Sequence, residues 1–181
     1  MKGPALAHGA AERAARESYG KLLAYLAKRC GGIEDAEDAL ADAFAAALER
    51  WPRDGVPDVP EAWLLVAARH RFLDRVRGDA RAVRLHERLG AAACEAQLAF
   101  ERSPELGDDR LGLMFACAHP AIDSSVRAPL MLQVVLGLDA ARIASAFLIA
   151  PAAMSQRLVR AKQKIAATGI PLRVPADPLP S

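Results

Sequence analysis

The sequence has little of what a β-sheet, a disulfide framework or a membrane span requires. Aromatic residues make up 5% of the 181 residues although hydrophobic residues make up 52%, and the frequent alanine favours closely packed helices over a sheet. Cys30, Cys94 and Cys117 are odd in number and far apart, which argues against a disulfide framework and for a reducing compartment. Every apolar run falls well short of the roughly 18 residues of a membrane span. We therefore expect an all-α, cytoplasmic protein.

Motifs for catalysis and for metal binding are also missing. The sequence contains no phosphate-binding glycine loop, no HExxH and no GxSxG. Its carboxylates gather on a helix face that we expect to be solvated, where pKa values are seldom raised. Cys117 and His119 are metal-ligand types, but a structural zinc site needs a second pair. The sequence therefore predicts no catalytic residue, no metal, no cofactor and no enzymatic activity.

Charge is unevenly distributed along the chain, although the formal net charge is only +2. Residues 34–42 contain no basic residue and five acidic ones, which are Glu34, Asp35, Glu37, Asp38 and Asp42. Residues 69–88 carry seven arginines. Separate acidic and basic faces indicate more than one charged partner.

Residues 138–165 have the pattern of a helix-turn-helix. Asp139 is a suitable N-cap for a short helix that stops near Leu148, and Pro151 suits the first turn of a second helix. In that second helix one face is apolar, with Met154, Leu158, Ala161 and Ile165. After Asp139 the stretch contains five basic residues and no acidic one. The layout is typical of a recognition helix that enters the DNA major groove; a helical hairpin with a solvated basic face is the alternative.

Apolar periodicity divides the rest of the chain into helical segments. Residues 1–10 are expected to be frayed, and the first helix is expected from Glu17 to Cys30. A helix from about Glu34 is expected to bury Leu40, Phe44, Ala47, Leu48 and Trp51. A proline-rich loop at 52–60 leads to a helix from about 61 toward 77. The tryptophans, Trp51 and Trp63, are expected to be core anchors.

Two small helical domains joined by a linker follow from this pattern, and the second contains the helix-turn-helix. Long apolar side chains disappear between Gly90 and Asp109, where we place the junction. The predicted segments are a domain at 10–88, a linker at 89–108, a domain at 109–170 and a Pro-rich tail at 171–181.

Three segments together resemble one protein family: DAEDALADAFAAALERWP at 35–52, EAWLLVAARHRFLDRVR at 61–77 and RIASAFLIAPAAMSQRLVRAK at 142–162. In this order and at this separation they resemble an extracytoplasmic-function (ECF) sigma factor, the dissociable promoter-recognition subunit of bacterial RNA polymerase. The phrases ESYGKLLAYLAKR, WPRDGVP, MFACAHPAID and GIPLRVP resemble one subgroup, whose longer members carry a C-terminal helical extension.

The resemblance implies a function in transcription initiation. The first domain would dock on core RNA polymerase and melt and read the −10 element, and the second would read the −35 element. The implied partners are core RNA polymerase, through its β′ clamp and β flap, and promoter DNA. An anti-sigma factor or the chain's own C-terminal extension would act as a regulator. The implied polymerase-binding residues are Asp35, Asp38 and Asp42.

The resemblance also implies two sets of DNA contacts. Arginines of the third helix would bind phosphates of the non-template strand, which gives affinity without sequence information. The start of the last helix would face base edges, and its later basic residues would lie nearer the backbone. The candidate DNA-binding residues are Arg69, Arg71, Arg75, Arg77, Ser155, Gln156, Arg157, Arg160 and Lys164.

The sequence departs from the family pattern at four positions: His70 replaces the usual Asn, Leu148 the usual turn glycine, and Ala150 and Ala153 hydroxyl residues near the cap. Base readout is therefore expected to rely on Gln156 and Arg157, with Ser155 as a phosphate contact.

Two other classes of function remain open from the sequence. A stand-alone helix-turn-helix regulator would need dimer symmetry and palindromic DNA, and would not need the acidic helix face. A helical interaction module, such as an anti-sigma protein, would have no role in DNA binding.

Overall fold

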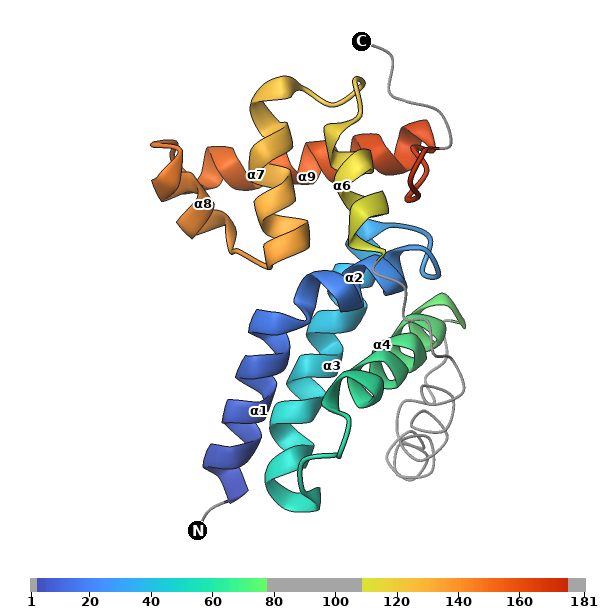
Figure 1. Cartoon of the computed structure of the whole chain (residues 1–181), viewed down its shortest axis with the longest axis vertical. Coiled ribbons are helices and arrows are strands. Elements are labelled where there is room, and N and C mark those ends of the chain that lie inside the picture. Colours follow the sequence, from blue (N-terminus) through green and yellow to red (C-terminus); the bar gives the residue numbers. More distant parts are fainter. Residues whose placement is uncertain (1–2, 78–108, 176–181) are drawn as a thin grey trace. The chain divides into compact units, whose positions relative to one another are not determined.

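The computed structural model describes residues 3–77 and 109–175, and every secondary-structure element in these ranges is a helix (Figure 1). This confirms the predicted all-α fold class. The described residues divide into two compact units, which are 3–18 with 35–77 and 19–34 with 109–175. No helix in these ranges is long and apolar enough to cross a membrane. The predicted linker, 89–108, lies outside the described residues.

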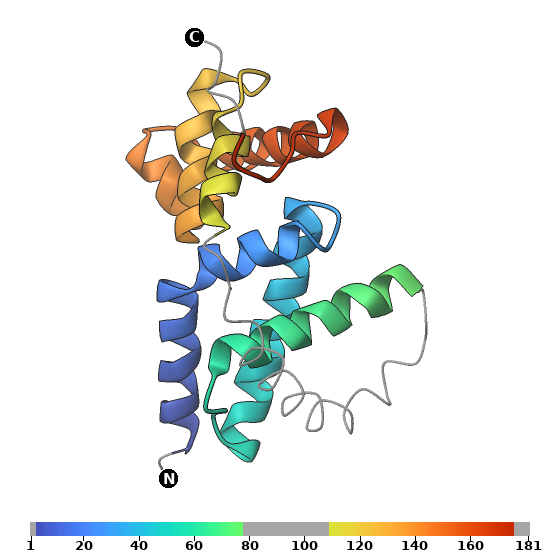
Figure 2. The same ribbon diagram turned by 45° about the vertical axis from the view of Figure 1, so that its right-hand side comes forward.

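The first unit contains α1 (Gly3–Glu17), α3 (Ile33–Asp54) from Asp35 onward, and α4 (Pro60–Arg77), which crosses α3 (Figure 1, Figure 2). Its core is rich in alanine, whose small side chain lets helices approach closely. Trp51 of α3 and Trp63 of α4 are 2% and 8% exposed, with ring centroids 5.5 Å apart at 70°. This edge-to-face contact is one that aromatic pairs favour, and it confirms both tryptophans as core anchors.

The N-terminal segment is helical from Gly3, and the prediction that residues 1–10 are frayed was therefore wrong. Along α1 a stripe of alanines recurs at helical spacing, and all are at most 5% exposed: Ala7, Ala10, Ala11 and Ala14. Alanine has the highest helix propensity of all residues. The stripe was missed because it consists of the smallest side chains rather than of leucine or valine.

Helix α3 differs from the prediction in two details. Leu48 was expected to point inward but is 40% exposed, whereas its neighbour Ala47 is buried as predicted. The helix also continues past Pro52, so the loop predicted for 52–60 is confined to 55–59. A proline so close to a helix end is tolerated because few backbone hydrogen bonds remain for it to interrupt.

The second unit contains α2 (Tyr19–Ala27), α6 (Arg110–Ala118), α7 (Ser124–Leu136), α8 (Ala140–Ala146) and α9 (Pro151–Thr168). Helix α2 packs against α6 and α7, and α9 packs against α7 and α8. The packing thus assigns residues 19–34 to this unit, whereas the sequence analysis places them in a domain at 10–88. The functional boundaries at 10–88 and 109–170 stay predictions.

Helices α2 and α7 approach each other closely at Gly20. A Cβ atom added to Gly20 would lie 2.0 Å from the carbonyl oxygen of Val135, a distance that no side-chain adjustment can relieve because the obstacle is backbone. Gly137, which ends α7 with φ = 68°, lies against the ring of Tyr19 in the same way. The absence of side chains at these glycines therefore sets the distance between α2 and α7.

We predict opposite effects for the same substitution at two helical glycines. Gly20→Ala should lower the free energy of unfolding by about 1–3 kcal/mol, because the new methyl group overlaps the α7 backbone. Gly9→Ala in α1 is the matched control, since the nearest atom to its added Cβ is a flexible Arg13 nitrogen at 4.0 Å. That change should raise stability by about 0.5–1 kcal/mol through helix propensity. Urea denaturation checks both, and equal stability of the two variants would contradict the close approach of α2 and α7.

Candidate nucleic-acid interface

Helices α8 and α9 begin where the sequence predicts, and α8 ends at Ala146, close to the predicted stop near Leu148. Asp139 caps α8, because its carboxylate accepts a hydrogen bond from a backbone N–H of the first turn at 2.8 Å. Pro151 is the first residue of α9, where its missing N–H costs nothing. At the other end Gly169 adopts the left-handed conformation (φ = 64°) that commonly closes a helix. Local sequence signals therefore fix the limits of both helices.

The turn between the two helices contains two of the departures from the family pattern, Leu148 and Ala150, and both are structurally unfavourable. Leu148 has φ = 56°, in the left-handed region where an L side chain is strained. Its side chain is 95% exposed, so no packing offsets the strain. Ala150 occupies the N-cap of α9 without a side-chain hydrogen bond. The first N–H groups of α9 therefore lack a side-chain acceptor at the cap.

The faces of α9 are separated as the pattern predicts. The predicted apolar residues are all buried: Met154, Leu158, Ala161 and Ile165. The predicted DNA-binding residues are all exposed: Ser155, Gln156, Arg157, Arg160 and Lys164. Lys162, a further basic residue of the helix, is only 7% exposed and belongs to the buried side. The exposed face of α9 is thus polar and cationic, without an acidic residue.

A groove of about 320 Å³ lies between the start of α7 and the cationic face of α9. Helix α9 lines it with Arg157, Arg160 and Lys164, and the opposite side contributes Asp123 and Ser125. The structure therefore brings together three of the five candidate DNA-binding residues of α9. This concentration of positive charge suits a phosphate group.

Asp123 was not singled out by the sequence analysis. It caps α7 by accepting hydrogen bonds from the N–H and the hydroxyl of Ser125, at 2.8 and 2.5 Å. These bonds, followed by the positive charges of Arg157 and Arg127, hold the pKa of the Asp123 carboxyl below its usual value. The sequence DSS is a signal for an N-cap, but it does not reveal that the cap faces α9.

The acidic face of α3 is exposed as predicted, at Asp35, Asp38 and Asp42. Two of its carboxylates are joined to α4 by one arginine, because the two terminal nitrogens of Arg75 lie 3.0 Å from an oxygen of Asp38 and 3.0 Å from an oxygen of Asp42. From the sequence, Arg75 is expected to contact DNA, and the two aspartates are expected to contact polymerase. In the structure these three residues form a single cluster.

The other arginines of α4 do not share one face. Arg69 is exposed and Arg71 is partly buried. Because an α-helix turns by about 100° per residue, Arg71 and Arg75 lie on one side and Arg69 on nearly the opposite side. Arg77 ends the helix, and its side chain lies outside the described residues. One continuous phosphate-binding face along α4 is therefore not formed by Arg69, Arg71 and Arg75.

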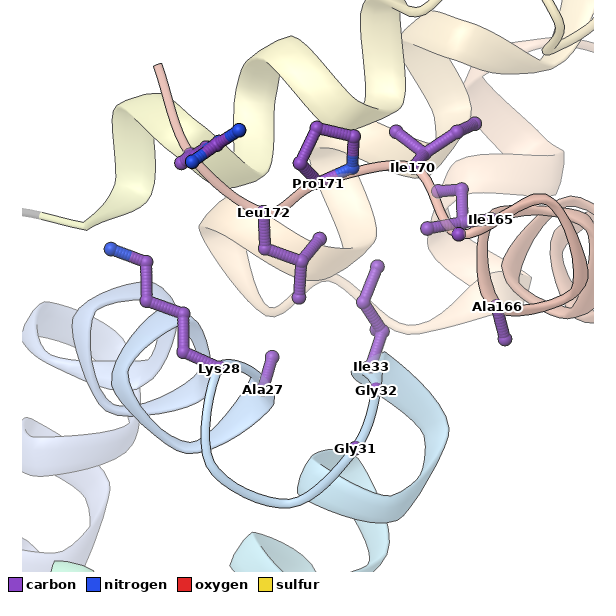
Figure 3. Close-up of a pocket in the computed structure, with 12 residues that line it drawn as sticks. Ala27, Lys28, Gly31, Gly32, Ile33, Ile165, Ala166, Ile170, Pro171 and Leu172 are labelled. Carbon is purple, nitrogen blue, oxygen red and sulfur yellow. The ribbon is translucent and has the colours of Figure 1, made fainter. Parts of the chain in front are cut away.

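A second pocket, of about 530 Å³, lies between the turn after α2 and the segment that follows α9. Ile33 and Leu172 extend into it from the two sides, and Lys28 lies at its edge (Figure 3). The titratable side chains of its lining are only Lys28 and Arg173. It offers no acid–base pair for catalysis within the described residues.

The described residues contain no cluster of three histidine, cysteine or acidic side chains that would hold a metal ion. His119 is instead engaged with the backbone, since its Nδ1 accepts a hydrogen bond from the N–H of Ala121 at 3.1 Å. Burial raises the pKa of the Cys117 thiol to about 12, so this group stays protonated near neutral pH.

Comparison with known proteins found a relative that aligns with most of the chain and a family that matches its first part. An uncharacterized protein of Rhizobium meliloti (strain 1021) is 38% identical over 168 residues, which cover 88% of this chain and 38% of that protein. The chain thus spans about two fifths of the length of this relative. No solved structure gave a significant match. Residues 15–82 match the family described as Sigma-70 region 2.

Proposed function

We propose that the protein is an ECF-type sigma factor, which directs core RNA polymerase to a bipartite promoter and assists DNA opening without catalysing a reaction itself. The observation that carries the proposal is the pairing of two features in one chain. The Sigma-70 region 2 match covers residues 15–82, and α9 presents an exposed cationic face later in the sequence. A promoter with two separate elements requires two such DNA-binding parts.

The first unit supplies charges of both signs for this function. The exposed carboxylates of α3 suit a basic surface on the polymerase, and such an association is sensitive to salt. In α4, Arg69 is exposed and free to meet phosphates on one side of the helix. Arg75 would first have to leave Asp38 and Asp42, which it bridges.

The second unit supplies the contacts for the −35 element. Gln156 and Arg157 lie on the exposed face of the first two turns of α9, where side chains of a recognition helix reach base edges. Arg160 and Lys164 follow on the same helix and line the groove, a position suited to backbone phosphates.

A stand-alone helix-turn-helix regulator is the second candidate. The geometry of α8 and α9 suits it equally, since the same pair of helices serves repressors and activators. It leaves the Sigma-70 region 2 match without a role, and for that reason we place it second.

The proposal predicts transcription that depends on this chain. Run-off transcription on a pool of promoter fragments, with core RNA polymerase alone as control, should give transcripts that appear only when the chain is added. Failure of the chain to bind core polymerase, together with tight binding to palindromic duplex, would favour the stand-alone regulator.

Reversing charge on α3 should weaken polymerase binding. Asp38→Arg with Asp42→Arg replaces attraction to a basic surface by repulsion, and we expect at least a tenfold loss in co-purification with core polymerase, with a larger loss at low salt. The fold should persist, because exposed ion pairs contribute only about 0–1 kcal/mol each.

Arg75→Ala is the matched control for this prediction. It removes the same two ion pairs but keeps both carboxylates, so polymerase binding should be retained or slightly strengthened. If Arg75→Ala weakens binding as much as the charge reversal does, the ion pairs rather than the acidic face are responsible, and the docking assignment is wrong.

Changes at the start of α9 should alter promoter preference. Gln156→Ala or Arg157→Ala should each reduce discrimination at one position of the −35 element by about 1–3 kcal/mol if the contact is bidentate. Transcription from a library randomised at that element measures the preference. Val159→Ala, at an exposed position of the same helix without a polar group, is the control, and an unaltered profile for both polar variants would remove them from base readout.

A further inference from the structure

The cationic face of α9 has an acidic neighbour that is not part of its own helix. Asp123 precedes α7 and lines the same groove as Arg157, Arg160 and Lys164. A second acidic residue does not line this groove. Its carboxylate is held in place by two hydrogen bonds from Ser125. The groove therefore contains one negative charge, held by hydrogen bonds, among three positive ones.

Arg127 stabilises the turn that precedes α7. Its Nε donates to the carbonyl of Ile122 at 2.9 Å, and a terminal nitrogen donates to the carbonyl of Pro120 at 3.3 Å. These bonds tie α7 to the turn that carries Asp123. The position of the carboxylate is thus set by hydrogen bonds within its own turn and the first turn of α7.

A fixed carboxylate in such a place has two electrostatic effects. It repels a phosphate that enters the groove, which weakens binding governed by charge alone. Its charge also attracts the guanidinium of Arg157, which lines the same groove, and such an attraction favours the side-chain directions that bring the two groups together. The first effect opposes binding to any duplex. The second favours only those complexes in which Arg157 contacts DNA while it points in a direction that the carboxylate favours.

We propose that Asp123 is a specificity-determining residue of the candidate DNA interface, which suppresses binding to unrelated duplex and positions Arg157 for base readout. The inference rests on the proposed function of α9 in reading the −35 element. Asp123 acts through Arg157 and the groove, and is a positioning residue rather than a base contact.

The N-cap role of Asp123 can be separated from its charge. Asparagine caps helices about as well as aspartate, and Asp123→Asn keeps an oxygen for the N–H of Ser125 while it removes the negative charge. Asp139→Asn makes the same change at the cap of α8, which does not line the groove. It therefore controls for the general loss of one acidic charge at a helix cap.

The experiment measures binding of the full chain to fluorescent duplex of random sequence at low and moderate salt. Asp123→Asn should raise this affinity about two- to fivefold at low salt, with a steeper salt dependence, because an exposed charge of this kind has a modest and screened effect. Asp139→Asn should have less than half of that effect. The holoenzyme is then tested on fragments that the wild-type protein transcribes, and its preference for them over random duplex should fall.

The role of Arg157 is tested by a double-mutant cycle. In an Arg157→Ala background, Asp123→Asn should no longer change the preference for promoter over random duplex. Persistence of the full change in that background, or an equal effect of Asp139→Asn, would overturn the positioning role of Asp123.

The role of Asp123 and the DNA-binding function of α9 can be disproved separately. If Arg160→Ala with Lys164→Ala weakens binding to random duplex but Asp123→Asn leaves it unchanged, the inference is wrong and the DNA-binding function of α9 stands. If none of these variants changes binding, α9 is not a DNA-binding surface and both are wrong.

Discussion

Burial of one stripe on α9 determines what the rest of that helix can do. Met154, Leu158 and Ile165 are at most 4% exposed, and they pack against α7 and α8. Because the helix advances by a fixed angle per residue, seating this stripe fixes the rotation of the whole helix. Ser155, Gln156 and Arg157 are exposed as a consequence. The buried apolar residues thus orient the polar side chains of the interface, although they do not contact the ligand themselves.

The two units use different means to bring helices together. In the first, the most frequent buried residues are alanines of α1, α3 and α4, and Trp51, Trp63 and a few leucines are buried among them. In the second, leucine and isoleucine side chains dominate, and close approach is limited to points such as Gly20. Alanine-rich packing loses little side-chain entropy on folding, but each contact buries little apolar area.

Much of the second unit could be predicted because its signals are local. Asp139, Pro151 and Gly169 mark helix ends by rules that involve only neighbouring residues, and the apolar stripe of α9 follows from spacing alone. The alanine stripe of α1 has the same spacing but almost no hydrophobic contrast, and so it was missed. The exposure of Leu48 depends on which helix lies opposite, which periodicity does not specify.

The sequence predicts which single residues of the candidate site are exposed, but it does not predict which of them lie next to each other. Exposure of Asp38, Asp42 and Arg157 follows from helical faces, whereas their neighbours come from other helices. Arg75 reaches Asp38 and Asp42, and Asp123 faces α9, through contacts between residues 33 or more positions apart in sequence. No short-range rule encodes such contacts. The acidic and basic residues were therefore assigned to different partners before the structure showed them together.

The bridge from Arg75 to two carboxylates links events that would otherwise be independent. A basic partner that takes up Asp38 and Asp42 removes the acceptors of Arg75, and an anion that takes up Arg75 leaves the carboxylates unpaired. The affinity of the ligand that binds first is reduced by the free energy needed to break the ion pairs of Arg75. The second ligand meets ion pairs that are already broken, so its affinity is not reduced. Such coupling is reciprocal by thermodynamic necessity, and because the pairs are exposed it amounts to only a few-fold in affinity, about 1 kcal/mol. Each ligand would accordingly bind slightly more tightly to a chain that already carries the other ligand, with no change of fold.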